Sequence, residues 1–257
     1  MSKFYLQKRS KKAFTLAEVL ITLGIIGVVA ALTIPTLMKN YQQVQYVTSL
    51  KKAYSQMNQV LQQMAMDNGD DIKTIFGNST VAGDAISSYY KVVKNCKTNL
   101  GGGCFAQFND NYDGSSGTTY DFDNNAAYYK FITADGIAFE LYSFNNNCTT
   151  NRGFAAAPDS PTYNSACAEV YIDVNGIKGP NNLGRDVFYY DITSNRTPLL
   201  YPKGGFYYSA TTNTGTLVDG GSYYWNYHGL DRCSTSGDKR GQFCAGRIID
   251  KSWTMDY

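Results

Sequence analysis

The residues best suited to binding a metal ion lie in one loop late in the chain, which reads DVNGIKGPNNLGRD over 173–186. Carboxylate, amide and carbonyl oxygens are the hard ligands that Ca²⁺ prefers. We therefore expect that calcium could be held by Asp173, Asn175, the carbonyl of Ile177 and Asp186, although the loop lacks the final glutamate of an EF-hand loop. The alternative is that these oxygens accept hydrogen bonds from the loop's own backbone amides. A weaker second candidate is the upstream acidic group Asp110, Asp113, Asp121 and Asp123.

Catalytic chemistry has few candidate residues in this chain. His228 is the only histidine, so a Ser-His-Asp or Cys-His system would have to use it, and no G-x-S-x-G surrounds a serine. A zinc site of several histidines is excluded, and we predict that the protein is not an enzyme. Adjacent tyrosines such as Tyr128-Tyr129 and Tyr189-Tyr190 could stack on sugars or bases, but adjacent residues of a strand point to opposite faces of a sheet, which favours a structural role.

Glu18 is the charged residue whose position needs a chemical explanation. It directly precedes twenty uncharged residues, VLITLGIIGVVAALTIPTLM, which end at Lys39. As a helix these residues span roughly 30 Å, the thickness of the hydrocarbon core of a bilayer. A carboxylate near that core costs on the order of 3 kcal/mol unless it finds a partner. Glu18 therefore predicts a charge pair at the start of a membrane-spanning helix.

The elements on either side of this span have opposite characters. Before it lies a leader with five Lys and Arg residues and no acid; after it, apolar residues recur at helical spacing between Val47 and Met64. That spacing predicts that the helix continues to about Asp67 with one apolar stripe. A large domain follows, so we expect the stripe to pack against that domain, the alternative being a coiled-coil dimer. Pro35 should kink or locally melt the helix, and Gly24 and Gly27 would permit close approach of another helix.

The remaining residues, 68–257, predict an α+β head. A short helix is expected within 81–93 and a long exposed loop over 109–125. Alternation over 128–133 and 137–142 around Ala134-Asp135-Gly136 predicts a hairpin. Further strands are expected at 168–174 and 187–192, followed by tyrosine-rich hairpins to about Tyr227 and a C-terminal strand, RIID. The composition, 43% apolar and 17% charged, suits a globular head.

Cysteine count and charge both place the head outside the cytoplasm. The leader's positive charge keeps the N-terminus in the cytoplasm. Six cysteines in an exported chain predict three disulfides. Of the fifteen connectivities that six cysteines allow, we predict the sequential one: Cys96–Cys104, Cys148–Cys167 and Cys233–Cys244. Without the leader, 18 basic and 21 acidic residues give a formal charge of −3, so no basic surface for nucleic acid is expected.

The order of features at the N-terminus resembles a known export signal. A basic leader, a small residue, Phe-Thr-Leu-Ala-Glu and an apolar helix follow one another from Lys3 to Met38. This order is similar to the prepilin signal of type IV pilins and of the pseudopilins of type II secretion. The resemblance covers residues 1–40 and, more loosely, the D-x-N-G-x-x-G-P-N pattern of the Asp173 loop; some major pseudopilins bind calcium in a head loop.

The resemblance implies a processing step and a role for Glu18. A prepilin peptidase would cut between Ala13 and Phe14 and methylate the new amine of Phe14; in the family the residue before the cut is nearly always Gly. Glu18 would then pair with the Phe14 amine of a neighbouring subunit, while Gly27 and Pro35 would belong to the assembling helix. The implied parts are a leader, 1–13, a long helix, 14–67, with a membrane and filament segment, 14–38, and an amphipathic segment, 39–67, and a head, 68–257.

The function implied is that of a filament subunit. Its partners would be copies of itself, other pilin-like subunits, a prepilin peptidase and an inner-membrane assembly platform. It would lie first in the bacterial inner membrane, as a single-pass protein, and later in a periplasmic or extracellular filament. Two alternatives remain: a minor pilin whose head binds DNA or glycan, and an anchored ectodomain that never polymerises. A separate alternative for the N-terminus is an ordinary secretory signal cut near Ala30-Ala31.

Overall fold

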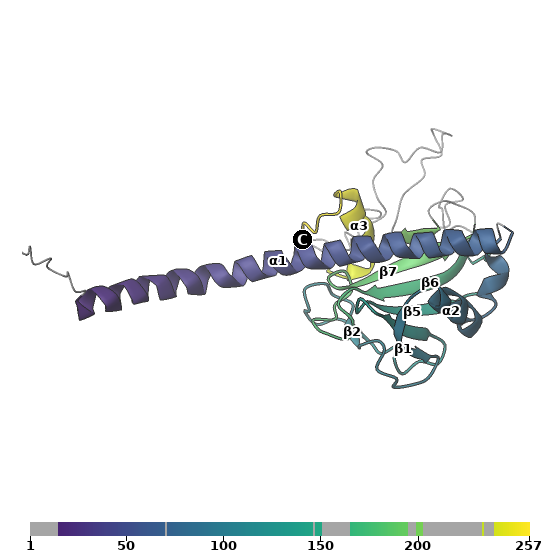
Figure 1. Cartoon of the computed structure of the whole chain (residues 1–257), viewed down its shortest axis with the longest axis horizontal. Helices are drawn as coiled ribbons and strands as arrows, with labels where there is room; N and C mark the ends of the chain where they lie inside the picture. The colour runs from purple at the N-terminus through teal and green to yellow at the C-terminus, as the bar shows by residue number, and fades with distance from the viewer. Residues whose placement is uncertain are drawn as a thin grey trace, which may run out of the picture. The chain divides into compact units, whose positions relative to one another are not determined.

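The computed structural model describes residues 15–69, 71–145, 147–150, 165–194, 199–202, 233 and 239–257. The chain divides into two compact units, Met1–Gln42 and Gln43–Tyr257. The helix α1, Leu16–Asp67, contributes residues to both units (Figure 1). Its first part is apolar on every side, and its second part carries one apolar stripe.

The second unit is built on a six-stranded antiparallel sheet. The strands lie in the order β1 (Val92–Lys97), β4 (Tyr129–Thr133), β5 (Ala138–Ser143), β6 (Ala166–Asp173), β7 (Val187–Thr193) and β8 (Leu200–Pro202). Residues alternate between the two faces, as in any strand. Phe131, Phe139 and Val170 therefore face one layer, whereas Ile132, Ala138 and Tyr171 face the other.

Helices cover the first face of the sheet. The stripe of α1 is buried there, with Leu50, Met57 and Leu61 fully inaccessible. The other helical elements of the described residues are η1 (Lys73–Phe76), α2 (Ser79–Ser88), η3 (Gly241–Phe243) and α3 (Cys244–Asp250). Asn58 on α1 accepts a hydrogen bond from the backbone N–H of Leu200, at 3.0 Å, and so satisfies an edge strand of the sheet. The apolar stripe of α1 thus packs against the head, as expected, rather than forming a coiled coil.

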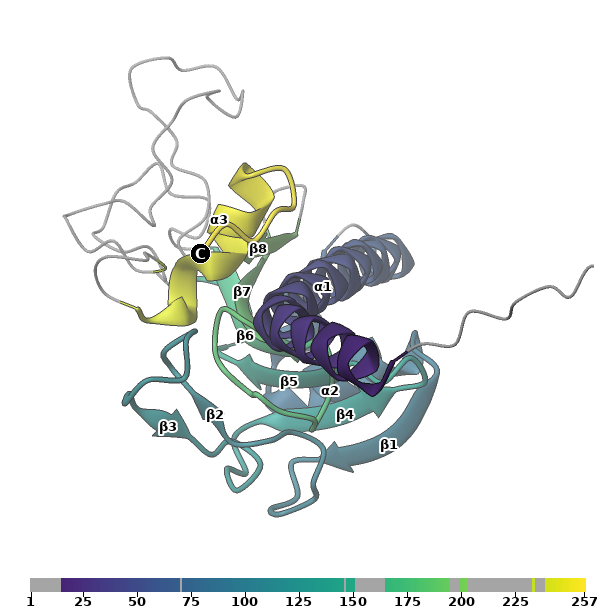
Figure 2. The same cartoon turned by 90° about the vertical axis from the view of Figure 1, so that its left-hand side faces the viewer.

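The segment between β1 and β4 covers the second face. It contains the short pair β2 (Phe108–Asn109) and β3 (Thr119–Tyr120), which Figure 2 shows beyond the sheet from α1. Phe105 and Phe108 are buried against Tyr171 and Tyr189 of the sheet. The long exposed loop predicted over 109–125 is exposed at 113–119 and 124–125, whereas Tyr120 and Phe122 pack on the second face of the sheet.

Three disulfides fix the loops of the head. They join Cys96 to Cys104, Cys148 to Cys167, and Cys233 to Cys244, which are the sequential pairs. The expected C-terminal strand RIID is instead part of α3, since Ala245 and Ile248, three residues apart, are both buried on one side of a helix. The short helix expected within 81–93 begins and ends earlier, at Ser79 and Ser88.

Candidate functional site

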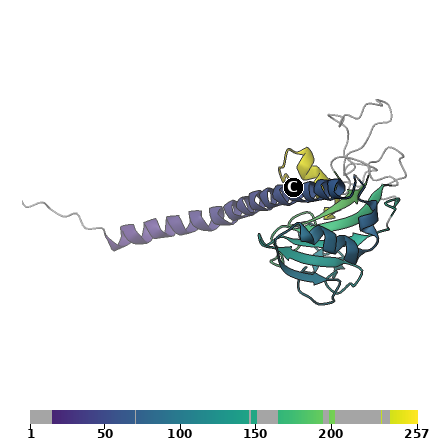
Figure 3. The same cartoon turned by 45° about the vertical axis from the view of Figure 1, so that its right-hand side comes forward.

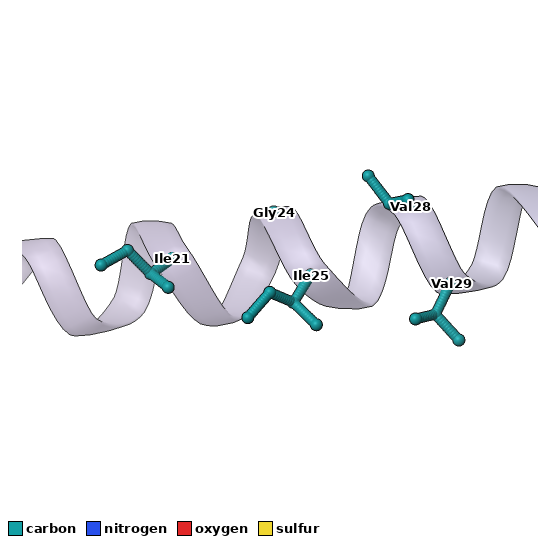
Figure 4. A pocket seen from close by; sticks show the side chains of 5 residues that line it. All are labelled: Ile21, Gly24, Ile25, Val28 and Val29. Carbon is teal, nitrogen blue, oxygen red and sulfur yellow. The ribbon is translucent and has the colours of Figure 1, made fainter.

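The amino-terminal half of α1 exposes apolar side chains on every side. Among the described residues, α1 is the one helix that is long and apolar enough to cross a membrane. Leu16 and Leu32 are 77% and 74% exposed. Figure 4 shows Ile21, Ile25, Val28 and Val29 projecting from the helix around Gly24. Burying each such side chain is worth about 1.5–3 kcal/mol, so this segment requires lipid or other apolar helices around it.

Glu18 closes the first turn of this helix through a capping box with Thr15. The backbone N–H and the hydroxyl of Thr15 both donate to Oε2 of Glu18, at 2.8 and 2.9 Å. In return, the backbone N–H of Glu18 donates to Oγ1 of Thr15, at 3.2 Å. This reciprocal pattern satisfies donors that a helix start otherwise leaves unpaired. Within the described residues the carboxylate has no cationic partner. Ala13 and Phe14, the predicted processing residues, lie outside the described residues.

Gly24, Gly27 and Pro35 lie within the same apolar segment. A Cβ added at Gly24 or Gly27 would meet nothing within 4 Å, so both glycines leave open space beside the helix. α1 is continuous through Pro35. The predicted local melting at Pro35 is therefore not observed, because a helix can lose one backbone hydrogen bond and remain helical when its other bonds persist.

The Asp173 loop brings two carboxylates into the protein interior. Asp173 and Asp186 are fully buried at the end of β6 and just before β7. Oδ1 and Oδ2 of Asp186 accept from the backbone N–H groups of Asn182 and Asn181, each at 2.8 Å. Oδ1 of Asp173 accepts from the backbone N–H of Asn175, at 3.2 Å. Backbone capping thus accounts for three of the four carboxylate oxygens.

Three buried oxygens of this loop remain without a protein partner: Oδ2 of Asp173, Oδ1 of Asn175 and Oδ1 of Asn181. Burial, and then repulsion from Asp186, raises the pKa of Asp173 well above its usual range. Burial also raises the pKa of Asp186. Unpartnered oxygens beside two carboxylates suit a cation chemically. However, no group of three or more His, Cys, Asp and Glu side chains in the described residues is arranged to hold a metal ion.

The second acidic group is dispersed among loop contacts. Asp110 accepts from the backbone of Thr118, and Asp123 accepts from the backbones of Gly103 and Cys104. Asp113 forms an ion pair with Lys239, at 2.6 Å. The fourth carboxylate of the group, that of Asp121, accepts hydrogen bonds from the side-chain amides of Gln107 and Asn124. These four carboxylates organise the loop rather than converge on one point.

The remaining chemical candidates of the sequence have structural contacts or lie outside the described residues. His228 is among the latter. Tyr129 and Tyr190 are fully buried against α1 and α2, and their neighbours Tyr128 and Tyr189 both donate to Glu169 on the other face. Adjacent tyrosines therefore point to opposite faces of the sheet, as the alternation of a strand requires.

Two buried charged residues that the sequence pattern did not predict lie beneath the second layer. Lys130 and Glu140 lie opposite each other on β4 and β5 and are fully buried. Nζ of Lys130 donates to the carbonyls of Phe122, Asp123 and Asn125, at 3.1–3.4 Å, while both oxygens of Glu140 lack a hydrogen-bond partner. A polar residue in an alternating strand normally predicts solvent on that face. Aromatic residues clustered over 105–128 were the one available signal that the face is covered.

Comparison with known proteins supports the N-terminal site. The family model for the prokaryotic N-terminal methylation motif matches residues 8–34, a range that includes Glu18 and most of the apolar segment. No curated protein and no solved structure matches the chain significantly. The chain combines a long N-terminal apolar helix, a six-stranded antiparallel sheet and disulfides in a type IV pilin-like α+β architecture. The chain thus carries the prepilin-type signal of type IV pilins and pseudopilins.

Proposed function

We propose that the protein is a structural subunit of a type IV pilus-like or type II secretion pseudopilus filament. The observation that carries this proposal is the exposed apolar half of α1, joined to the methylation motif at residues 8–34. A soluble protein would have to bury these side chains in its own core. Here they suit two successive environments, first lipid and then the apolar helices of other subunits.

The first stage of the proposal is insertion and processing. The basic leader keeps the N-terminus in the cytoplasm, and the head lies on the outer side of the inner membrane. A prepilin peptidase then cuts between Ala13 and Phe14 and methylates the amine of Phe14. An inner-membrane assembly platform next moves the subunit into a periplasmic or extracellular filament. In each environment the apolar residues before Lys39 remain away from water.

The second stage concerns Glu18. In the capping box its carboxylate accepts from two donors of Thr15, so the single subunit carries a partly satisfied charge at the start of its helix. A neighbouring Phe14 amine would supply the full positive charge that Thr15 lacks. Gly27 then permits close helix approach, and the missing N–H of Pro35 gives the helix a point at which it can bend. The same pairing would set the axial position of one subunit relative to the next.

The test compares Glu18→Ala with Asn40→Ala, a control at an exposed polar position of α1 just beyond the span. Filaments sheared from cells and subunits in isolated membranes are both quantified by immunoblot. We expect Glu18→Ala to abolish filaments while membrane insertion stays normal, and Asn40→Ala to leave both unchanged. Normal filaments with Glu18→Ala would refute the proposed pairing. Sequencing of the mature N-terminus should give Phe14; a start at Leu32 would instead indicate an ordinary secretory signal.

A further inference from the structure

A groove of about 370 Å³ opens in the head between the last turn of α1, η1 and α2. Its walls combine apolar side chains, such as Met64, Ile75 and Val81, with polar ones, such as Asn68 and Tyr89. Val81 is 49% exposed and Tyr89 is 40% exposed, so the groove offers apolar surface to a partner.

The surroundings of this groove are acidic. The hydroxyl of Tyr89 donates to Oδ2 of Asp67, at 2.5 Å, which places a carboxylate at the rim. Asp71 lies just before η1, where it accepts from the backbone N–H of Lys73. Over residues 64–89 the sequence holds four Asp residues and one Lys, a formal charge of −3. A partner for the groove should therefore present an apolar side chain beside a positive charge.

The Asp173 loop presents that combination. Ile177 is 55% exposed, and Lys178 beside it is exposed too. The loop is held in shape from within, because Nδ2 of Asn175 donates to the carbonyls of Lys178 and Gly179, at 2.8 and 3.2 Å. Gly176 approaches the hairpin turn so closely that an added Cβ would lie 2.6 Å from the carbonyl oxygen of Gly136. Ile177 is therefore an apolar side chain on a supported turn.

The groove and the Ile177 turn lie at opposite ends of the head. At one end of β5, Ala138 pairs with Asp173, directly before the loop. At the other end, Ser143 binds the hydroxyl of Ser79 and the carbonyl of Phe76, which belong to α2 and η1. The loop also pairs with β2 through Asn109 and Asn182. Figures 1 and 3 show α2 beside the C-terminal end of α1, away from β2.

We propose that Ile177 and Lys178 of one subunit dock into the α1–η1–α2 groove of a second copy of this chain. This inference rests on the proposed function. Two different surfaces at opposite ends of one head make a heterologous contact, which builds an open helical polymer when the rotation between successive subunits does not close into a ring. Lys178 then faces the acidic rim at Asp67 and Asp71. A symmetric dimer through two grooves would instead bring the acidic rims together, and like charges disfavour it.

The test uses full-length protein in cells that assemble it, with sheared filaments and membrane-inserted subunits measured separately. The variants are Ile177→Ser, Asp71→Lys, Lys178→Asp and the double charge swap. Val93→Ser is the control, because Val93 is 64% exposed on β1, outside both surfaces. Each single variant should lower filament yield on the order of tenfold, while the charge swap should restore most of it. The melting temperature of each purified subunit checks its folding.

A direct readout comes from carbodiimide cross-linking of filaments mixed from isotopically light and heavy subunits. We expect peptides that join Lys178 of one subunit to Asp67 or Asp71 of another. Normal filament yield with Ile177→Ser, or wild-type filaments that give no such cross-link, would overturn the contact and leave the filament function intact. A charge swap that restores nothing would also overturn it. Wild-type protein that forms no filament would refute the proposed function, and the contact with it.

Discussion

Gly83 of α2 lies against the ring of Tyr129 on β4, and replacing it with Ala would have two opposing effects on stability. A Cβ added at this position would lie 2.0 Å from Cγ of Tyr129. Carbon atoms in ordinary contact are about 3.5 Å or more apart, so the ring would have to move by roughly 1.5 Å. Helix propensity alone predicts the opposite outcome, because Ala is favoured over Gly in a helix by about 1 kcal/mol.

The surroundings of Tyr129 decide whether Gly83→Ala raises or lowers the stability of the fold. Its ring is fully buried, and its hydroxyl donates to Oδ1 of Asp84, at 2.6 Å, and accepts from Nδ2 of Asn95, at 2.7 Å. Overpacking a well-packed core costs about 1–3 kcal/mol, and a hydrogen bond to a charged group adds about 1.5–3 kcal/mol. Asp84 is itself exposed, which reduces the second contribution. We therefore expect Gly83→Ala to lower the free energy of unfolding by about 2–4 kcal/mol.

The assay is urea unfolding of the full chain in detergent, followed by near-ultraviolet circular dichroism of the tyrosines. Gly77→Ala is the matched control, since a Cβ there would meet nothing within 4 Å and the backbone already has helical angles. That control should change stability by no more than about 1 kcal/mol. In a Tyr129→Ala background the penalty of Gly83→Ala should vanish. A Gly83→Ala protein as stable as wild type would refute this reasoning.

Three further outcomes follow from the described contacts. Burial raises the pKa of Glu140, so the folded state holds that proton more tightly than the unfolded state, and the free energy of unfolding falls as pH rises above about 4.3. Glu140→Gln should therefore gain stability relative to wild type between pH 4 and 7. A difference between the two urea midpoints that does not change with pH would contradict this. If calcium binds the Asp173 loop, a chelator should lower the melting temperature of wild type but not of Asp173→Asn. Thr15→Val removes a cap worth about 1 kcal/mol and should lower filament yield, whereas Thr15→Ser should not.

The elements that the sequence predicted well are those in which one face is buried. The stripe of α1 from Val47 to Met64 repeats at helical spacing, and its members are buried in the structure, with Tyr54 partly so. The hairpin at Ala134-Asp135-Gly136 is formed by β4 and β5, because Gly136 has the positive φ, +83°, that such turns require. Local pattern and tertiary packing agree at these positions.

The second layer could not be predicted, because its evidence is not local. Lys130 and Glu140 alternate with buried aromatic residues and so indicate a solvent-facing side of the hairpin. That side is covered by a segment from earlier in the chain, held through the carbonyls around Asp123. Asp123 in turn binds the backbone beside Cys104, whose disulfide to Cys96 fixes the start of the segment. The periodicity within the strands does not indicate that another segment covers this face of the sheet.

The way α1 is divided explains how a subunit could change environment without losing its fold. Among the described residues, every side chain of α1 in the buried core comes from Tyr46 onward, while residues before it contribute none. A long-range polar contact near that boundary, from Nε2 of Gln43 to the carbonyl of Tyr257, also lies within the second unit. In the proposed assembly, exchanging lipid for neighbouring helices around residues 16–38 would therefore leave the core of the head untouched. The free energy of that exchange depends on the apolar segment and Glu18, and the stability of the head is set separately.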